Sequence, residues 1–525
     1  MSYKVLVTTS GVGSRLGDFT KFTNKALLRI GNKPAISYII ESYPVETQFV
    51  ITLGYYGDQI KNFLELAYPE RNFEFVWVEK FVGEGSSLLF SLFHAKKNLQ
   101  EPFIFHASDT IVLDKIPPPD NNWNAGYKGV GSSSYASFDL MGDKVSMLYE
   151  KGNLNPDFLH VGLVGIKDFD LFWKLVEQIL VSENYAFTLG DVDVLKIMVG
   201  QADFEVFECK RWFDIGNVDK MKEAKANLDK GDIHVLDKLA ESIYKVNGSI
   251  VKFFYDDTIC QNRITRNSHL KGIVPEIRGY SKNFYKYDYV KGDLYANVAN
   301  KSNFHVLLDW ANKNLWKETD TVNSQKLQEL CLDFYFNKTE KRLEELYKTR
   351  GISDVVDIIN QEEIPTVSSM LKQIDKRELC NTTPTLFHGD FILDNIIKVD
   401  EKNFTLIDWR QDFAGELVAG DKYYDLGKLA HNLVVNHEII DNNHFQIKKG
   451  KDGSIIINIH RLQTLVECER ILFDWLKRND FDVKKVKILR AIIWLNMSPL
   501  HHHPFDNFLY YFGKYNLYQA LKNGN

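Results

Sequence analysis

The chain has 525 residues, with 44% hydrophobic and 13% aromatic residues and a formal net charge of -6. This length predicts two or three domains, and the absence of a basic surplus excludes nucleic acid as the main partner. Five scattered cysteines without a CxxC pair indicate neither a zinc site nor a disulfide framework. With no apolar run of about 18 residues and no signal-peptide pattern at the start, we expect a cytoplasmic protein without a membrane span. The oligomeric state stays open.

Up to about residue 220, short apolar strands alternate with amphipathic helices, from YKVLVTT at residues 3–9 to FIFHASD at 103–109. This alternation predicts a mainly parallel sheet flanked by helices. A charged helical segment at 218–232 marks the expected domain boundary. Beyond residue 233, strand-rich sequence such as SIYKVNGSIVKFFY gives way to long helical segments. A small sheet lobe followed by a helical lobe is the order that a two-lobed kinase requires.

A glycine loop follows the first predicted strand. Gly11 and Gly13 fall in a strand-to-helix turn, where glycine lets backbone amides approach a phosphate closely. The GxGxxG pattern of a Rossmann dinucleotide loop fails because residue 16 is Leu16. Arg15 and Lys25 follow instead, and these cations suit the neutralisation of a triphosphate and an incoming phosphate nucleophile. The alternative is an ordinary turn with solvated side chains.

Two aspartates stand at the ends of predicted elements in the same region. Asp109 ends the apolar strand FIFHASD, and Asp214 in RWFDIGN precedes a helix. Two carboxylates beside a phosphate loop can hold Mg²⁺, although either one alone is explained as a turn residue or helix cap. His106, three residues before the first aspartate, is expected to pack rather than to catalyse.

The ordered set GVGSRL, GEGSSL, HASD, HVGLVGI and WFDIGN resembles the nucleotidyltransferases that activate phosphorylated small molecules. These include sugar-1-phosphate nucleotidylyltransferases and bacterial phosphocholine cytidylyltransferases. Over residues 1–225, the resemblance implies a GT-A-like (Rossmann-like) α/β fold and attack by a substrate phosphate on the α-phosphorus of a nucleoside triphosphate. Asn24 stands where the family usually has proline. By this resemblance Lys25 bridges the reacting phosphates, Asp109 and Asp214 bind Mg²⁺, and the nucleotide is held by Gly11, Gly13, Ser14, Arg15, Gly83, Gly85 and Ser86.

The segment FHGDFILDN, followed by LIDW, has the spacing of a kinase catalytic loop and its metal-binding strand. Asp390 precedes Asn395 by five residues, and Asp408 comes eighteen after Asp390. A kinase needs a carboxylate that accepts the proton of the attacking hydroxyl, together with an amide and a second carboxylate on Mg²⁺. A turn at HGD and a strand end at IDW would explain each part alone but not the joint match.

These motifs resemble the aminoglycoside phosphotransferase and choline kinase family over residues 233–525. The resemblance implies an α+β, two-lobed, protein-kinase-like domain that uses ATP, with Asp390 as catalytic base and with Asn395 and Asp408 on Mg²⁺. It also implies that Lys252 in SIVKFF contacts the ATP phosphates and that Asp425 in YYDLGKLA supports the loop.

The upper lobe departs from the family pattern in two places. The sequence before the strand lysine lacks a glycine-rich cover, and the helix expected after it contains no glutamate. The phosphate contact can therefore come from other groups, such as Ser242.

The segment WLNMSPLHHHPFDNFLYYFGKY is rich in aromatic residues and histidines. Aromatic faces can cage a quaternary ammonium, as a choline-like substrate requires, although a helix core with a surface loop is the plainer interpretation. The run His501 to His503 precedes Pro504, and three consecutive side chains cannot all face one ion. We do not expect a metal site there.

The two halves together predict a bifunctional enzyme. The C-terminal kinase phosphorylates a small alcohol, and the N-terminal domain couples that phosphate to a nucleotide, with CTP and a choline-like substrate favoured. Such donors commonly feed surface-polysaccharide or lipid decoration. A sugar or polyol substrate with UTP or GTP is the close alternative. Others are an antibiotic phosphotransferase with an unrelated front domain, and a nucleotide-binding scaffold with one degenerate domain.

Overall fold

A computed structural model describes residues 3–129, 133–153, 155–182, 189–228 and 238–522. The chain divides into two compact units, one made of residues 1–260 and 278–289 and the other of 261–277 and 290–525. The sequence predicted a domain boundary between residues 225 and 233, and residues 229–237 of that stretch fall outside the described ranges. Each unit is described by itself below.

The first unit is built on a nine-stranded mixed sheet with the order β5-β4-β1-β6-β11-β8-β12-β10-β9. Four neighbouring strands, β5, β4, β1 and β6, are parallel, as the alternating pattern predicted, whereas β11 runs antiparallel to β6. The strands are β1 (Lys4–Thr8), β4 (Gln48–Leu53), β5 (Asn72–Trp77), β6 (Phe103–Ala107), β8 (Trp123–Tyr127), β9 (Ser137–Met141), β10 (Lys144–Tyr149), β11 (Phe158–Ile166) and β12 (Glu205–Cys209).

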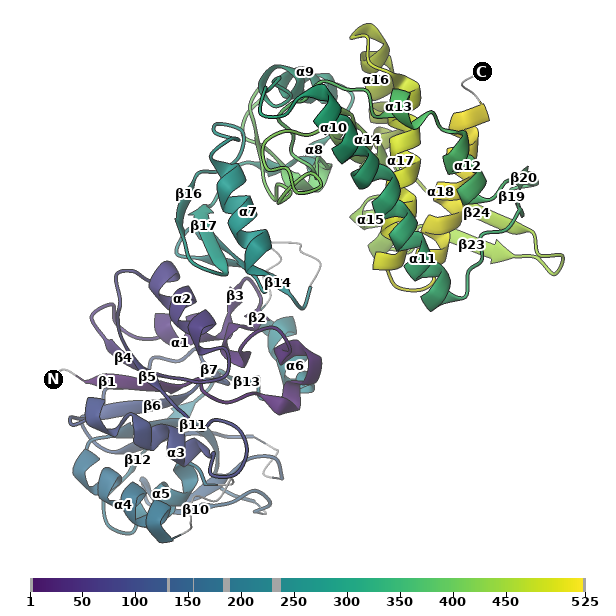
Figure 1. Ribbon diagram of the computed structural model, residues 1–525. Helices are drawn as coiled ribbons and strands as arrows, with labels where there is room; N and C mark the ends of the chain where they lie inside the picture. The colour runs from purple at the N-terminus through teal and green to yellow at the C-terminus, as the bar shows by residue number, and fades with distance from the viewer. Residues whose placement is uncertain (1–2, 130–132, 154, 183–188, 229–237, 523–525) are drawn as a thin grey trace. The chain divides into compact units, whose positions relative to one another are not determined.

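Helices cover both faces of this sheet (Figure 1). Val5 and Val7 of β1 face one core and Leu6 the other, because successive side chains of a strand point to opposite sides. The first core contains α1 (Ala35–Glu41) and α2 (Gly57–Ala67). The second contains α3 (Leu88–His94), α4 (Phe169–Ser182) and α5 (Asp191–Met198). Smaller elements of this unit are β2 (Arg29–Ile30), β3 (Lys33–Pro34), β7 (Thr110–Val112), β13 (Trp212–Asp214) and α6 (Val218–Leu228).

A four-stranded sheet, ordered β14-β15-β17-β16, also packs into the first unit. Its hairpin turn is Asn247-Gly248, where φ values of 48° and 74° fit the left-handed turn that joins two strands tightly. The Tyr244 hydroxyl donates to the Leu27 carbonyl at 2.7 Å, and its ring centroid lies 5.5 Å from that of Phe63 on α2. The apolar face of this sheet shares the first core with α1 and α2. The strands are β14 (Glu241–Val246), β15 (Ser249–Phe254), β16 (Ile277–Tyr280) and β17 (Phe284–Asp288).

The second unit is mainly helical, in agreement with the long helical segments of the sequence. Its main core is centred on α17, which buries residues on several faces. Two small sheets, β18-β21-β22 and β20-β19-β24-β23, lie within it. No helix in the described ranges is long and apolar enough to cross a membrane. The helices are α8 (Tyr295–Val298), α9 (Phe304–Asn314), α10 (Ser324–Leu332), α11 (Lys338–Arg350), α12 (Val367–Gln373), α13 (Lys376–Leu379), α14 (Lys422–Asn432), α15 (His437–Asp441), α16 (Gln463–Arg478), α17 (Val483–Met497) and α18 (Phe505–Lys522).

The strands of the second unit are short, and α7 (Asp257–Asn267) runs across the division between the units. A π-helical turn, Asp333–Asn337, joins α10 to α11. The strands are β18 (Asp293–Leu294), β19 (Asp357–Ile359), β20 (Glu362–Ile364), β21 (Ile396–Lys398), β22 (Phe404–Leu406), β23 (Phe445–Lys449) and β24 (Ile455–Ile459).

Two candidate active sites

The first candidate site lies at the carboxyl ends of the parallel strands β1, β4 and β6, where open α/β sheets bind ligands. The loop after β1 is tied to β4, since the Thr9 N–H donates to the Thr52 carbonyl at 3.1 Å. Gly13 adopts a φ of 70°, and a Cβ on it would lie 3.2 Å from Cβ of Lys25. Glycine is therefore needed both for the backbone angle and for the close approach of the lysine.

Asn24 holds the lysine in place. Its side-chain amide donates to the carbonyls of Thr9 at 2.8 Å and Tyr55 at 2.6 Å. Its Oδ1 accepts from the Ala26 N–H at 2.9 Å and caps the short helical turn that begins with Lys25. The asparagine thus anchors this turn by hydrogen bonds, at the position where the sequence departs from the expected proline.

Lys25 and Asp109 form an ion pair, with Nζ to Oδ2 at 2.8 Å and side-chain exposures of 18% and 21%. Burial raises the pKa of the Asp109 carboxyl, but the charges of Lys25 and Arg15 outweigh it and hold this pKa below its ordinary value. The carboxyl is therefore ionised at neutral pH. It is available as an oxygen ligand once a cation replaces the ammonium.

The second predicted carboxylate is brought to the same place by a strand pair. β7 and β13 are antiparallel and align Asp214 with Thr110, the residue after Asp109. A Cβ built on Gly216 would lie 3.0 Å from Oδ1 of Asp214, 3.1 Å from a guanidinium nitrogen of Arg15 and 3.5 Å from Oδ2 of Asp109. Three predicted side chains therefore converge on one point, although Asp109 and Asp214 are 105 residues apart along the chain and Arg15 is farther still from Asp214.

Tyr135 was not identified from the sequence. Its hydroxyl donates to Oδ2 of Asp214 at 2.8 Å, while the Gly216 N–H donates to Oδ1 at 2.7 Å. Burial and this hydrogen bond raise the pKa of Tyr135, so the phenol stays a donor. The segment around Tyr135 carries no motif, and only the fold places it beside the aspartate.

The second glycine loop forms a tight turn of its own. Gly83 and Gly85 have φ values of 81° and 84°, and the Ser86 hydroxyl donates to the Gly83 carbonyl at 2.7 Å. Phe81 stands just before this loop, and a Cβ built on Gly54 would lie 2.9 Å from its ring. The loop therefore begins close to the carboxyl end of β4. Among the described residues, no hydrogen bond joins this loop to the Lys25–Asp109 pair. Ser14 begins a 3-10 helix, Ser14–Thr20, and Gly11 has open space around its Cα.

His106 packs, as the sequence predicted. It is fully buried, its Nε2 donates to the Thr110 carbonyl at 3.0 Å, and its Nδ1 accepts from the Tyr43 hydroxyl at 2.9 Å. Burial lowers the pKa of His106 to about 4, so the ring is neutral.

The second candidate site is the loop that contains Asp390. His388 is buried, with Nε2 donating to the Ile407 carbonyl at 3.0 Å and Nδ1 accepting from the Asp390 N–H at 3.3 Å. Burial lowers the pKa of His388 to about 4, which keeps one ring nitrogen as an acceptor. Gly389 has a φ of 87°, and a Cβ there would lie 2.5 Å from Cβ of Arg410. The HGD sequence is therefore required by the packing of this loop.

Asp390 is a third exposed, and two side chains contact it. Lys428 of α14 lies 2.7 Å from its Oδ1, and the Asn395 amide donates to its Oδ2 at 3.1 Å and to its backbone carbonyl at 2.9 Å. Burial raises the pKa of Asp390, but the Lys428 charge outweighs it and holds the pKa below its ordinary value. The negative charge of Asp408 raises the pKa of Asp390 and so opposes the effect of Lys428. The predicted catalytic loop thus brings Asp390, Asn395 and Asp408 together.

Asp408 has a φ of 60°, which is uncommon for a residue other than glycine. Arg263, on the part of α7 that belongs to the second unit, donates to Oδ1 of Asp408. The Trp409 ring donates to the Arg263 carbonyl at 2.9 Å and fixes the helix beside this strand end. The helix α7, in which the kinase pattern would require a glutamate, therefore contributes Arg263, which contacts the predicted metal ligand Asp408.

Arg266, one turn further along α7, holds the loop from the other side. Its buried guanidinium donates to the carbonyls of Phe387 and Leu417, at 2.5 and 2.8 Å, and to that of Arg410. Burial lowers the pKa of Arg266 to about 9. Sequence reasoning missed Arg266 and Lys428. The spacing of Lys428 three residues after Asp425 on one helix was the available signal for the latter.

Asp425 supports the loop, as the sequence predicted. Its carboxylate accepts from the N–H groups of His388 at 2.8 Å and Gly389 at 2.7 Å, and from the Trp316 ring at 3.1 Å. Burial raises the pKa of Asp425 to about 6 although these donors favour its charged form.

We expect Asp425→Ala to loosen the catalytic loop, because each buried donor left unpaired costs about 1–3 kcal/mol. Hydrogen exchange measured by mass spectrometry should be faster in peptides covering residues 386–396. Asp474→Ala, at an exposed position of α16, is the matched control. Equal exchange in the two variants would show that Asp425 does not hold the loop.

Two other residues predicted for the kinase half belong to the first unit. Lys252 and Ser242 lie on neighbouring strands of the first unit, β15 and β14, and Lys252 is buried. Asp390, Asn395 and Asp408 belong to the second unit. His501 packs its ring 5.0 Å from that of Phe505, and His503 lies 3.4 Å from Asp506.

Both sites fit Mg²⁺ by the chemistry of their side chains. Within the described parts of the chain, no three histidine, cysteine or carboxylate side chains gather closely enough to hold a metal by themselves. Mg²⁺ is usually bound by one or two carboxylates together with substrate phosphates. Asp109 with Asp214, and Asp408 with the amide of Asn395, are oxygen ligands of this kind.

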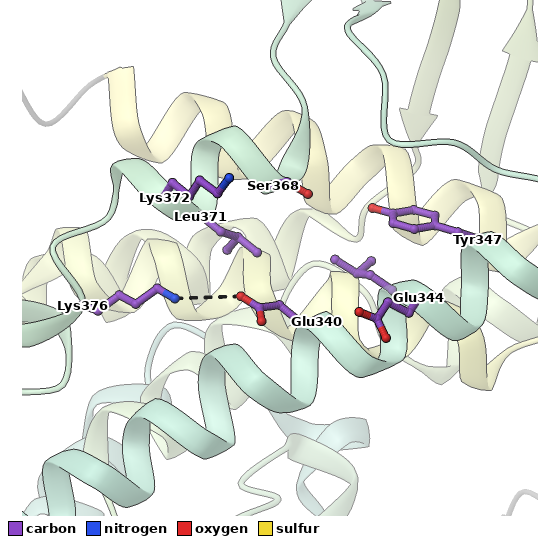
Figure 2. A pocket seen from close by; sticks show the side chains of 8 residues that line it. Glu340, Glu344, Tyr347, Ser368, Leu371, Lys372 and Lys376 are labelled. Carbon is purple, nitrogen blue, oxygen red and sulfur yellow. Dashed lines mark ion pairs between the residues drawn. The ribbon is translucent and has the colours of Figure 1, made fainter.

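A separate pocket of about 330 Å³ lies between α11 and the helices α12 and α13 (Figure 2). Glu340 and Glu344 of α11 line it, and Lys376 lies 3.9 Å from the carboxylate of Glu340. None of the predicted site residues lines this pocket.

Three solved structures are similar to part of this chain. A UDP-glucose pyrophosphorylase complexed with UDP-glucose aligns with 43% of this chain and 98% of its own, with 17% identity and a TM-score of 0.38. A putative glucose-1-phosphate thymidylyltransferase from Bacillus anthracis covers 45% and 99%, with 17% identity and a TM-score of 0.38. The CTP:phosphocholine cytidylyltransferase of Streptococcus pneumoniae covers 44% and 100%, with 18% identity and a TM-score of 0.37. No protein-family model and no curated protein matches the chain.

Proposed function

We propose that the protein is a bifunctional enzyme. Its second unit phosphorylates a small hydroxyl compound with ATP, and its first unit transfers a nucleotidyl group, with CTP favoured, onto that phosphate and releases pyrophosphate. The product would be made in the cytoplasm and would feed surface-polysaccharide or lipid decoration. The observation that carries the proposal is the convergence of Arg15, Asp109 and Asp214 beside the loop after β1, with Lys25 paired to Asp109.

In the nucleotidyl transfer, an oxygen of the substrate phosphate forms a bond to the α-phosphorus, and the bond from that phosphorus to the pyrophosphate oxygen breaks. Arg15 and Lys25 neutralise the two phosphate groups that must meet. The amides after β1, exposed by Gly11 and Gly13, bind the triphosphate. Tyr135 and the Gly216 N–H keep Asp214 oriented toward the same point.

In the phosphorylation, the hydroxyl oxygen forms a bond to the γ-phosphorus, ADP leaves and the hydroxyl proton passes to Asp390. The Asn395 amide and Lys428 orient the Asp390 carboxylate, and its lowered pKa keeps it ionised before the substrate binds. Mg²⁺, when bound by the carboxylate and amide groups of the two sites, would withdraw charge from the transferring phosphoryl and nucleotidyl groups. Lys252 remains the proposed contact to the ATP phosphates.

The two activities would follow one another, since the product of the second unit is the nucleophile of the first. A shared chain keeps the intermediate at raised local concentration near the next enzyme. A sugar or polyol with UTP or GTP fits the same chemistry.

A scaffold with a degenerate kinase half is the second candidate. The ion pair between Arg263 and Asp408 favours it, because an arginine there competes with Mg²⁺. Under this alternative, nucleotide binds but no phosphate is transferred.

We expect the full chain, incubated with Mg²⁺, ATP and CTP, UTP or GTP, to form an NDP-linked product from one of a panel of hydroxyl compounds. Mass spectrometry identifies the nucleotide and the acceptor together. Asp390→Ala should yield neither product nor intermediate, whereas Asp109→Ala should accumulate the phosphorylated intermediate. Nucleotide binding without any phosphorylated compound across the panel would support the scaffold.

A further inference from the structure

Three cations of the second unit lie near one another, and we call Lys338, Arg342 and Arg410 the cationic cluster. Lys428, which is paired with Asp390, is near Lys338. Lys338 and Arg342 are four residues apart on α11, so their side chains leave the same face of that helix. The backbone N–H of Arg410 donates to the carbonyl of His388 at 3.0 Å, so Arg410 lies beside the loop that contains Asp390.

One aromatic ring brings two of these cations together. The Lys338 ammonium lies 4.0 Å and the Arg410 guanidinium 4.9 Å from the ring centroid of Phe334. Phe334 belongs to the π-helical turn before α11, and such turns occur frequently at functional sites. The ring holds the two positive charges near each other by cation–π contacts.

The cluster contacts backbone carbonyls and an aromatic ring rather than carboxylates. Arg342 donates to the Asn496 carbonyl at 3.0 Å, and Arg410 donates to the Asp412 carbonyl at 3.1 Å. In the parts of the chain that the structure describes, neither arginine nor Lys338 forms an ion pair with a carboxylate. Asp412 and Glu345 offset part of this positive charge without pairing with it. Like charges gathered without a direct ion pair destabilise one another, so the arrangement suits an anionic ligand.

Lys338 is mostly neutral at pH 7 in the free protein and would take up a proton when an anion binds beside it. Burial, together with the positive charges of Arg410, Arg342 and Lys428, lowers the pKa of Lys338 to about 6, and Asp412 acts in the opposite direction. Lys428 forms the ion pair with Asp390 and also acts on Lys338, so the cluster lies near the proposed catalytic carboxylate.

Two carboxylates of α11, Glu340 and Glu344, face away from the cluster, whereas Glu345 lies on the side of Lys338 and Arg342 and favours the charged form of Arg342. Glu340 lies two residues, or about 200° around the helix, from both Lys338 and Arg342, and Glu344 follows on the same side as Glu340. These two acidic side chains line the pocket of Figure 2 with Lys376. Glu340 and Glu344 therefore add no negative charge at the cluster.

We propose that the hydroxyl compound phosphorylated by the second unit is an anion, whose carboxylate or phosphate group binds the cationic cluster while its hydroxyl meets Asp390. This inference rests on the proposed kinase function. A quaternary ammonium would meet like charges at this place, so a choline-like acceptor is disfavoured.

The test compares acceptors that differ mainly in charge: glycerol, choline, D-glycerate and glycerol phosphate. With the full chain, Mg²⁺ and ATP, kcat/KM should be at least about tenfold higher for an anionic acceptor than for glycerol or choline, since one charge-assisted contact contributes about 1.5–3 kcal/mol. The better of glycerate and glycerol phosphate tells whether a carboxylate or a phosphate is preferred. Higher kcat/KM for choline or glycerol would overturn the inference.

Two variants examine the cluster itself. Lys338→Met keeps a chain of similar length over Phe334, and Arg342→Met removes the next charge on the helix. Each should raise KM for the anionic acceptor about tenfold or more and change KM for ATP less than about twofold. Lys341→Met, at an exposed position of the same helix, is the matched control and should change neither value.

A binding measurement separates this inference from the kinase proposal. Sodium sulfate, compared with sodium chloride at equal ionic strength, should raise the thermal transition of the wild type and of Lys341→Met more than that of Lys338→Met or Arg342→Met. If sulfate acts through the cluster but no acceptor is phosphorylated, the anion site stands and the kinase function fails. If the variants respond to sulfate as the wild type does, the anion site is wrong.

Discussion

Asp109→Asn is expected to lower nucleotidyl transfer by about a hundredfold to a thousandfold while phosphorylation of the alcohol continues. The substitution keeps the size of the side chain but removes the charge that pairs with Lys25 at 2.8 Å and that would hold Mg²⁺ beside Asp214. Loss of one preorganised charge contact to a reacting phosphate commonly has an effect of this size. Release of pyrophosphate, measured with the phosphorylated intermediate supplied directly, gives the rate.

Asp143→Asn is the control for this experiment. Asp143 is exposed in the turn between β9 and β10, and its substitution removes the same charge from the same unit. Its rate should match the wild type. If Asp109→Asn retained full nucleotidyl transfer, the site formed by Arg15, Lys25, Asp109 and Asp214 would not be the catalytic one.

Asp390→Asn is expected to lower phosphorylation of the alcohol by about a hundredfold or more and to leave nucleotidyl transfer intact. A positioned general base commonly contributes about 10²–10⁴-fold. An amide can still accept from Asn395, but it cannot take the hydroxyl proton and loses the ion pair with Lys428. The transfer of labelled γ-phosphate from ATP to the acceptor measures the step.

The effect should lie in kcat rather than in KM for ATP, because Asp390 acts on the hydroxyl group and not on the nucleotide. Asp474→Asn, on the exposed side of α16, removes the same charge and should behave as the wild type. An unchanged kcat in Asp390→Asn would exclude this aspartate as the base and count against the kinase proposal as a whole.

The local motifs could be predicted because short-range geometry sets them. A glycine with positive φ, such as Gly13 or Gly389, is required where the backbone turns tightly against a neighbouring side chain. The alternation of strands and helices likewise anticipated the four parallel strands around β1 and the helices on both faces. The antiparallel half of the same sheet was not anticipated, because strand direction depends on long-range pairing rather than on apolar pattern.

The division into compact units could not be predicted in the same way. The strands around Tyr244 have the sequence pattern of an independent hairpin. In the structure their apolar face packs on α2, and this packing depends on the position of a helix far away in the sequence. A boundary drawn from composition at residues 225–233 cannot detect this, since burial depends on contacts between distant segments.

The carboxylates proposed to be catalytic could be identified from their spacing in the sequence, whereas their partners could not. Asp390 and Asn395 are five residues apart in one loop, so the chain itself keeps them together. Tyr135, Arg266 and the cationic cluster reach their sites from segments 79 to 122 residues away, or from separate helices, and carry no motif. Side chains that orient or neutralise a site come from distant segments, so only the packing of the folded chain identifies them. The residues proposed to react are held by local backbone geometry, so their spacing can be recognised in the sequence.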